Sequence, residues 1–274
     1  MTTEALKKTA RKLRLEAIRM VYEGGEGHPG PALSIGDIVT ALYFEIMRLR
    51  PEEPDWPDRD RLVLSKGHAC PIVYAALSER GYLGKPVGDF HLRQLHSIFQ
   101  GHPTMGKTPG IDMTSGSLGN GIAIGAGMAI AGQLGHRNYD VYVIVGDGEL
   151  QEGINWEGIN LAAARSLGHL IVFVDRNGWQ SGGTVDEILG TNDISRRFEA
   201  FGWHTQSIDG HDFDAILGAV ENAKRESGRP SAIICDCIKG KGLSFMENNN
   251  DWHKGVLTAE QYQTAQKELG GEPA

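Results

Sequence analysis

The chain has 274 residues, of which 40% are hydrophobic and 23% are charged, and its formal net charge at pH 7 is −8. This composition is typical of a globular protein that buries a sizeable core. Because phosphate backbones attract basic surfaces, the acidic balance argues against a nucleic acid partner. A membrane-spanning helix needs roughly 18 or more consecutive apolar residues, and the sequence has no such run. We therefore expect neither nucleic acid nor a membrane as a partner.

The three cysteines are Cys70, Cys235 and Cys237. An odd and sparse set indicates a reducing compartment rather than a disulfide framework. The charged N-terminal segment also lacks the apolar core of a signal peptide. We expect a cytoplasmic protein with buried thiols. The alternative for Cys235 and Cys237, which would share one face of a strand, is a metal-binding pair.

The first 117 residues are predicted to contain short elements and a long loop. Apolar residues at helical spacing predict a helix over 4–22, and Ser34 is a suitable N-cap for a helix that reaches about residue 47. A strand is expected at 61–64 and a helix at 69–80. Residues 81–117 are punctuated by Gly and Pro, which predicts an irregular segment of the kind that is usually functional or flexible.

The rest of the chain alternates apolar strands with helices. The predicted strands are 139–145, 170–175, 203–208 and 232–238, and the predicted helices are 118–135, 149–167, 194–201 and 213–225. Strands without polar alternation, separated by helices, are typical of a parallel sheet covered on both faces. The sequence therefore predicts an α/β fold with a mostly parallel sheet and helices on both faces, in a single domain that spans residues 1–274.

Two oxygen-bearing side chains directly follow two of these strands. Asp147 lies in Gly146-Asp147-Gly148, and Asn177 follows the next strand in the chain. Ligands of open α/β sheets bind beyond the carboxyl ends of the strands, and Mg²⁺ favours oxygen ligands together with phosphate oxygens. Gly-Asp-Gly alone is also a common turn. Two such donors at neighbouring strand ends nevertheless favour a site for a metal and a diphosphate.

A second glycine-rich segment contains Gly119, Gly121, Gly125 and Gly127. It superficially suggests a dinucleotide-binding loop, but no apolar strand precedes it, and that fingerprint requires one. These glycines are better explained by a helix that packs closely against a neighbour.

Histidines and lysines in loops are further candidates. His28, His68 and His102 each lie beside Gly or Pro in an irregular segment, and imidazoles can transfer protons near neutral pH. The remaining histidines before residue 212 are interpreted as surface or packing residues: His91, His96, His136, His169, His204 and His211. The segment Lys239-Gly240-Lys241-Gly242 has two open interpretations, contact with an anionic group or a solvated turn.

Several of these segments match a known family. Six motifs occur in the order found in transketolases: Gly27-His28-Pro29-Gly30, Ser65-Lys66-Gly67-His68-Ala69, Gly101-His102-Pro103, Thr114-Ser115-Gly116-Ser117-Leu118-Gly119, Gly146-Asp147-Gly148-Glu149-Leu150-Gln151-Glu152-Gly153 and Asp175-Arg176-Asn177. The chain therefore resembles the diphosphate-binding domain of transketolases, from about residue 6 to about residue 255. The resemblance implies the thiamin-diphosphate-binding fold and the cofactor thiamin diphosphate with Mg²⁺ or Ca²⁺.

The resemblance also implies roles for residues at the cofactor's diphosphate end. Asp147, Asn177 and the backbone carbonyl of Trp179 would bind the metal, and Asn177 would also contact the cofactor. Gly148 and His68 would contact the diphosphate. Trp179 departs from the family pattern, in which a smaller apolar residue is usual.

At the reacting end, the resemblance implies that Gly116 and Leu118 touch the aminopyrimidine ring. His28, His102 and His253 would face the reacting carbon and the sugar hydroxyls. Asn120 departs from the family pattern, since glutamine is frequent there.

The transketolase domain that binds the pyrimidine and supplies the activating glutamate is not recognised in this sequence. The resemblance thus implies the N-terminal subunit of a split transketolase, whose partner is a C-terminal transketolase subunit in an α2β2 assembly. Glu152 would lie at a subunit interface and link the active sites, and Glu157 would lie near it.

The expected activity is the transfer of a two-carbon ketol unit from a ketose or ketose phosphate to an aldose acceptor. Two alternatives remain open. One is a subunit of another thiamin diphosphate enzyme, of the 2-oxo acid dehydrogenase or synthase type. The other is a non-catalytic partner that binds cofactor and stabilises an assembly.

Overall fold

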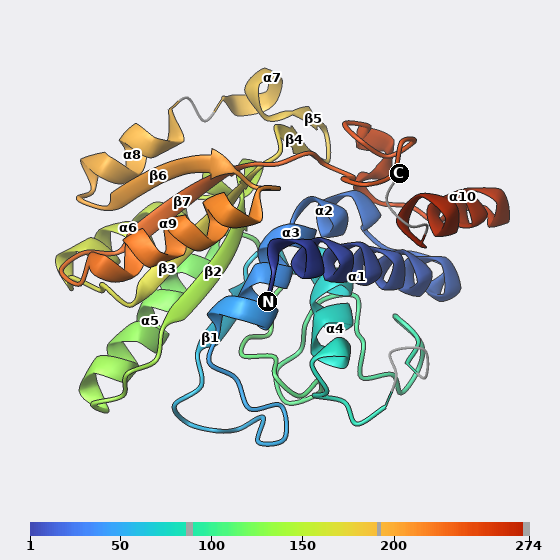
Figure 1. The fold of residues 1–274 in the computed structure, drawn as a ribbon. Helices are drawn as coiled ribbons and strands as arrows, with labels where there is room; N and C mark the ends of the chain where they lie inside the picture. Colours follow the sequence, from blue (N-terminus) through green and yellow to red (C-terminus); the bar gives the residue numbers. More distant parts are fainter. Residues whose placement is uncertain (86–89, 191–192, 271–274) are drawn as a thin grey trace.

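A five-stranded sheet with the order β1-β2-β3-β7-β6 forms the centre of the fold, and every neighbouring pair of its strands is parallel (Figure 1). The computed structural model describes residues 1–85, 90–190 and 193–270. The strands are β1 (Arg61–Leu64), β2 (Val141–Gly146), β3 (Leu170–Arg176), β6 (His204–Asp209) and β7 (Ser231–Asp236). The predicted fold class, a parallel α/β sheet covered by helices, is confirmed.

Alternate side chains of the central strands enter two separate cores. Tyr142, Ile144 and Phe173 face one core, where α1 (Thr3–Gly24), α3 (Gly36–Ala41), α4 (Cys70–Glu79) and α9 (Phe213–Arg225) cover the sheet. Val143 and Val172 face the other core, beneath α5 (Asn120–Leu134), α6 (Gly153–Ala164) and α8 (Ile194–Ala200). Because both faces are covered, β2, β3 and β7 lack polar alternation, which explains their continuous apolar runs in the sequence.

The predicted N-cap at Ser34 is wrong, although residues 36–46 are helical as predicted. The chain forms α2 (Pro29–Ser34) and α3, followed by a π-helical turn, η1 (Leu42–Ile46). Ser34 is the last residue of α2 rather than an N-cap, and its hydroxyl donates a hydrogen bond of 2.6 Å to Asp175 Oδ1. A tertiary contact therefore takes the hydroxyl that local sequence reasoning assigned to a cap.

Several further elements, most of them short, were not predicted. They are η2 (Gly67–Ala69), the hairpin β4 (Trp179–Gln180) and β5 (Gly183–Thr184), α7 (Val185–Leu189), η5 (Asn250–His253) and α10 (Ala259–Gly270). The predicted helix over 149–167 is divided into η4 (Gly148–Gln151) and α6. Helix α10 lies beside α1, although the two are at opposite ends of the sequence (Figure 1). In the part of the chain that the structure describes, no helix has the length and apolar character needed to cross a bilayer.

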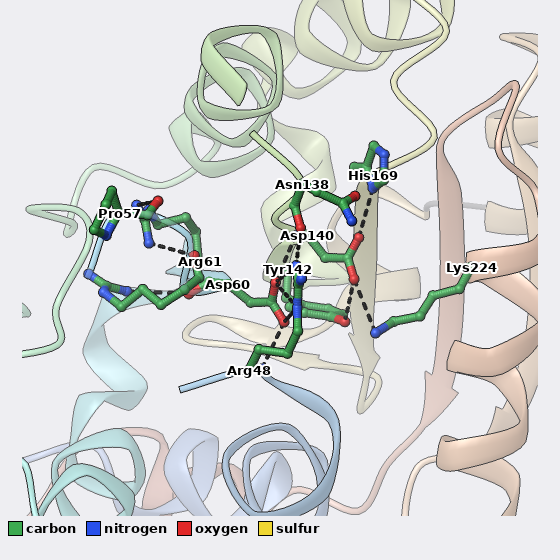
Figure 2. A network of polar contacts seen from close by, with 10 residues as sticks. Arg48, Pro57, Asp60, Arg61, Asn138, Asp140, Tyr142, His169 and Lys224 are labelled. Atoms are coloured by element: carbon green, nitrogen blue, oxygen red, sulfur yellow. Dashed lines mark hydrogen bonds and ion pairs between the residues drawn. The ribbon is translucent and has the colours of Figure 1, made fainter. Parts of the chain in front are cut away.

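Charged side chains tie the amino ends of the strands together (Figure 2). Asp60, which is fully buried, accepts hydrogen bonds from the backbone N–H groups of Arg48 and Asp140, at 2.8 and 2.9 Å. The Asp140 carboxylate contacts His169 Nδ1 at 2.9 Å and Lys224 Nζ at 3.0 Å. This network lies at the amino ends of the strands. It therefore stabilises the fold at the side of the sheet opposite the carboxyl ends, where a ligand would bind.

Candidate active site

Asp147 and Asn177 lie together at the carboxyl ends of β2 and β3, as the spacing predicted. Asp147 is 3% exposed, and its two carboxylate oxygens accept backbone N–H groups from Gly148 at 2.8 Å and Gly178 at 2.7 Å. Asn177 donates its amide N–H to Asp175 Oδ2 at 2.8 Å, while its Oδ1 accepts the N–H of Trp179 at 3.0 Å. The two side chains line one cavity.

That cavity has a volume of about 360 Å³ and gathers residues from every motif. Each residue to which the sequence assigned a metal, cofactor or catalytic role lines it: His28, His68, His102, Gly116, Leu118, Asp147, Gly148, Glu152, Asn177, Trp179 and His253. Glu157 is exposed on α6 and is not among the lining residues. The structure therefore brings the candidate residues together, whereas their individual roles stay predictions.

A larger hollow of about 700 Å³ lies between α1 and α4 and contains none of these residues. Two of its cations already have carboxylate partners, since Lys12 pairs with Glu79 and Arg19 pairs with Glu16. The smaller cavity at the strand ends is the better candidate because catalytic groups converge on it.

Four histidines form a cluster over the cavity. The ring centroid of His28 lies 5.1 Å from that of His68, 5.8 Å from that of His253 and 6.4 Å from that of His102. Burial, followed by the charge of His102, lowers the pKa of His28 to about 4. Burial and then the charge of Lys239 lower the pKa of His253 to about 3.

Burial also lowers the pKa of the other two imidazoles, His68 and His102. All four rings are therefore neutral at pH 7. A neutral imidazole can accept a proton on one ring nitrogen while the other donates a hydrogen bond, which suits it to chemistry at sugar hydroxyl oxygens.

A buried ion pair below the cavity was missed by the sequence reasoning. Lys66 is 2% exposed and pairs with the fully buried Asp175, which also accepts hydrogen bonds from Ser34 and Asn177. Burial would raise the pKa of Asp175, but the charge of Lys66 outweighs it and holds that pKa below its usual range. The pair fixes the Asn177 amide group, so that its nitrogen faces Asp175 and its oxygen faces away.

Lys239 is a lining residue for which the sequence left two interpretations open. Its side chain is fully buried, and Nζ lies 2.6 Å from Asn250 Oδ1 and 2.9 Å from His253 Nδ1. Burial and then the charge of Lys66 lower the pKa of Lys239 to about 8. The solvated turn is therefore wrong for this residue, and the buried ammonium group can face an anion in the cavity.

Glu149 was also missed, and it links three segments of the site. Its carboxylate accepts hydrogen bonds from the hydroxyl of Ser65, from the N–H of Gly119 at 2.8 Å and from the N–H of Gly146 at 3.0 Å. The loop that carries Gly116 and Leu118 is thereby held against the end of β2.

The residues present fit a diphosphate with a hard divalent cation. A carboxylate, an amide oxygen and nearby backbone carbonyls are the oxygen donors that Mg²⁺ accepts. A side chain at Gly148 would come within 3.0 Å of Gln180 Cβ, so only glycine leaves the backbone accessible there. Gln180 Oε1 and Ser115 Oγ are buried without hydrogen-bond partners among the described residues.

Asp147 fits a cation for a further reason. Burial, and then the charge of Asp175, raise the pKa of Asp147 to about 6. No group of three or more His, Cys, Asp and Glu side chains suited to a metal forms within residues 1–85, 90–190 and 193–270. A metal at Asp147 would therefore also need amide, backbone and ligand oxygens. The three cysteines are free and buried.

Comparisons with known proteins agree with this geometry. The family model for "Transketolase, thiamine diphosphate binding domain" matches residues 5–274. The chain is 47% identical to SqwG, the 6-deoxy-6-sulfo-D-fructose transketolase subunit of Clostridium sp., with 96% of this chain and 94% of the relative covered. It is 37% identical to one of the subunits of the apulose-4-phosphate transketolase of Phocaeicola vulgatus, with 98% and 95% covered.

Solved transketolases share the fold but are much longer. The crystal structure of transketolase from Campylobacter jejuni superposes with a TM-score of 0.92 at 34% identity. The superposition covers 98% of this chain and 43% of the Campylobacter jejuni chain. The Leishmania mexicana enzyme gives a TM-score of 0.90 at 32% identity, with 41% of its chain covered. The chain thus belongs to the transketolase family and corresponds to its N-terminal, thiamin-diphosphate-binding part.

Proposed function

We propose that this chain is the cofactor-binding half of a two-chain transketolase, which transfers a two-carbon ketol unit from a ketose to an aldose acceptor. The observation that carries the proposal is the single cavity in which Asp147, Asn177 and the four histidines converge. A diphosphate-metal site beside a cluster of neutral proton-transfer groups is the combination that this chemistry needs.

The proposed cofactor is thiamin diphosphate with Mg²⁺, for which Ca²⁺ is an alternative. Asp147, Asn177 and the carbonyl of Trp179 hold the metal, while Gly148 and His68 contact the diphosphate. Lys239 adds positive charge on the same side of the cavity. When bound, the cofactor supplies the nucleophilic carbon for cleavage of the bond beside the ketose carbonyl.

The aminopyrimidine end rests on the loop that Glu149 holds in place, where Gly116 and Leu118 line the cavity. A side chain at Gly116 would lie 3.3 Å from the ring of His102. Glycine therefore leaves the space beside His102 open for the aminopyrimidine ring. Gly116 also has a φ of 138°, a conformation that other residues rarely adopt.

The histidines of this chain move protons at the substrate. His28, His102 and His253 donate to, or accept from, the carbonyl and hydroxyl oxygens on either side of the cleaved bond. A well-placed general acid or base contributes roughly 10²–10⁴-fold to a rate. Because the imidazoles are neutral at pH 7, each can first accept a proton and then return it from the imidazolium form, which serves both directions of the transfer.

The proposed partner is a C-terminal transketolase subunit that carries the pyrimidine-binding domain, in an α2β2 assembly. Helix α5 has no charged residue over its 15 residues, a composition typical of helices that are covered all round. Ile124 on α5, Ile154 and Leu161 on α6, and Leu118 at the cavity are nevertheless exposed. This apolar surface adjoins Glu152, so a partner that covers it would also close the cavity, with Glu152 and Glu157 at the interface.

The relatives support this division into two chains. The two relatives named as subunits match this chain over nearly their whole length, whereas the solved transketolases are more than twice as long. We also propose a cytoplasmic location, because the cysteines are unpaired and buried.

The proposed donor is a ketose with an anionic group at the end remote from its carbonyl. One relative is named for 6-deoxy-6-sulfo-D-fructose and another for apulose-4-phosphate, and both names contain such a group, a sulfonate or a phosphate. Pentose phosphates, other ketose phosphates and sulfosugars are therefore the donors to compare first.

Reconstitution tests the proposal. The purified chain is mixed with a candidate pyrimidine-domain subunit, thiamin diphosphate and Mg²⁺, and transfer from a labelled ketose phosphate or sulfoketose to an aldose is measured. We expect transfer by the mixture and none by either chain alone. Robust transfer by this chain alone would contradict the two-chain account, and a stable, cofactor-loaded complex without transfer would favour a non-catalytic partner.

A further inference from the structure

His211, which the sequence interprets as a surface or packing residue, lies in a buried chain of polar contacts. Arg14 donates two hydrogen bonds to the carboxylate of Asp37, at 3.0 and 2.6 Å. His211 Nδ1 contacts the same carboxylate at 2.7 Å. The side chains of Arg14 and Asp37 are 5% and 8% exposed, and that of His211 is 11% exposed. Three segments that are far apart in sequence are thereby joined.

The second ring nitrogen of His211 holds the backbone that leads into the active site. The N–H of Ile238 donates to His211 Nε2 at 2.8 Å, and Ile238 immediately precedes Lys239. With Nδ1–H donating to Asp37 and Nε2 accepting from Ile238, the ring is the neutral imidazole with one defined tautomer. The carboxylate of Asp37 fixes that tautomer: it can only accept a hydrogen bond, so the ring proton must be on Nδ1.

The loop that carries His211 must approach β7 closely for this contact to form. A side chain at Gly210 would lie 2.4 Å from Cys237 Sγ and 3.0 Å from Cys235 Cβ, so glycine is required there. The N–H of Gly210 donates to the carbonyl of Asp236 at 2.9 Å. The approach therefore ends with the imidazole directly against the Ile238 backbone.

From Ile238 the chain turns into the cavity. Gly240 donates its N–H to the carbonyl of Gly30 at 3.1 Å, and Lys239 places its ammonium group beside His253 and Asn250. Of the two contacts on the ammonium group, the one from His253 is made by a residue that lines the cavity, whereas His211 holds the start of the turn from outside the cavity.

We infer that His211 is a positioning residue: through the N–H of Ile238 it holds Lys239 where the ammonium group meets an anion, the diphosphate of the cofactor, in the cavity. The inference rests on the proposed function, since it requires an anion at Lys239. It assigns to Arg14, Asp37 and His211 a role in ligand binding, although none of them lines the cavity.

A merely structural role predicts a different outcome. If His211 only stabilises the fold, its loss should lower the melting temperature. The contribution of Lys239 to the affinity for the anion should then stay unchanged. If it positions Lys239, its loss should weaken anion binding only while Lys239 is present. The two roles are therefore separated by a double-mutant cycle rather than by either substitution alone.

The experiment measures the affinity of the full chain for inorganic pyrophosphate in the presence of Mg²⁺ by calorimetric titration. The variants are His211→Leu, which makes neither contact, and His211→Gln, whose amide can donate to Asp37 and accept from Ile238. Lys239→Met and the double variant His211→Leu/Lys239→Met complete the cycle. If His211→Leu does not fold, His211→Ala takes its place, and circular dichroism verifies each fold.

We expect His211→Leu to weaken pyrophosphate binding on the order of 10-fold, as is typical when a residue that orients a ligand-binding group is lost. His211→Gln should stay within about 3-fold of the unmodified chain, because it restores both hydrogen bonds. In the Lys239→Met background, His211→Leu should cause no further loss.

An unchanged affinity in His211→Leu, or an equal loss with and without Lys239, overturns the inference. If Lys239→Met weakens binding but His211→Leu does not, the positioning role fails while the proposed function stands. If the unmodified chain, alone and with its partner, binds no pyrophosphate, both fail.

Discussion

Replacing Lys66 by Met should destabilise the protein strongly. Asp175 is fully buried, and Lys66 supplies its only ion pair among the described residues. Removing one partner of a buried pair leaves an uncompensated charge and typically costs about 3–5 kcal/mol. That is a large part of the roughly 5–15 kcal/mol by which domains are usually stable.

The same substitution at an exposed pair provides a matched control. Lys254 pairs with Glu26, and their side chains are 56% and 41% exposed. Surface pairs contribute about 0–1 kcal/mol, so Lys254→Met should have little effect. Urea unfolding, followed by circular dichroism, gives both free energies, and Lys66→Met should also lower the melting temperature by on the order of 10 °C.

Two results would refute this reasoning. One is an equal loss of stability in Lys66→Met and Lys254→Met, because burial would then not decide the cost. The other concerns Lys66→Met/Asp175→Leu, which removes both charges. We expect this double variant to recover part of the lost stability, since replacing both partners of a buried pair by apolar groups is often neutral or stabilising.

Three further predictions concern acid stability, a glycine and the apolar surface. Burial would raise the pKa of Asp140, but His169 and Lys224 outweigh it and lower that pKa. Its ionised form therefore stabilises the fold above about pH 4, and this contribution is lost as the pH falls through the lower folded-state pKa. Asp140→Asn should flatten the acid side of the stability curve measured by urea unfolding, and an unchanged slope would contradict this. Gly119 has a φ of 88°, and a side chain there would lie 2.6 Å from Glu152 Cβ. Gly119→Ala should therefore lower the free energy of unfolding in urea by at least about 1–2 kcal/mol. An unchanged free energy would contradict this, because it would show that the turn relaxes. Ile154→Asp should abolish association with the partner subunit in light scattering while the chain stays folded. Val256→Asp, at another exposed residue, should leave association intact. Loss of association in both variants would contradict the proposal that the partner binds the apolar surface of α5 and α6.

The central strands and the two oxygen donors could be predicted because their signals are local. The apolar runs end at Val145 and Val174, two and three residues before the donors, and parallel strands align their carboxyl ends at one edge of the sheet. Asp147 and Asn177 therefore had to be neighbours once the sheet was parallel. The family motifs added the histidines, whose loops carry no periodic pattern from which their positions could be derived.

The polar groups beneath the cavity could not be predicted, because their partners are distant in the sequence. Lys66 pairs with Asp175 across 109 positions, and His211 contacts Asp37 across 174 positions. A lysine in a Ser-Lys-Gly segment and a histidine after glycine both carry the local pattern of exposed loop residues. Ser34 was assigned to a helix cap for the same reason, since only the tertiary structure places Asp175 within reach of its hydroxyl.

The measurement closest to the central claim is the affinity of the two-chain complex for thiamin diphosphate, titrated with Mg²⁺ and with excess chelator. Glu221→Ala is the matched control, because it removes one carboxylate from a side chain that is 71% exposed. We predict that Asp147→Ala abolishes the Mg²⁺-dependent part of the affinity, whereas Glu221→Ala leaves it intact. An Asp147→Ala complex that binds the cofactor as tightly as the unmodified complex, with the same dependence on Mg²⁺, would contradict the account.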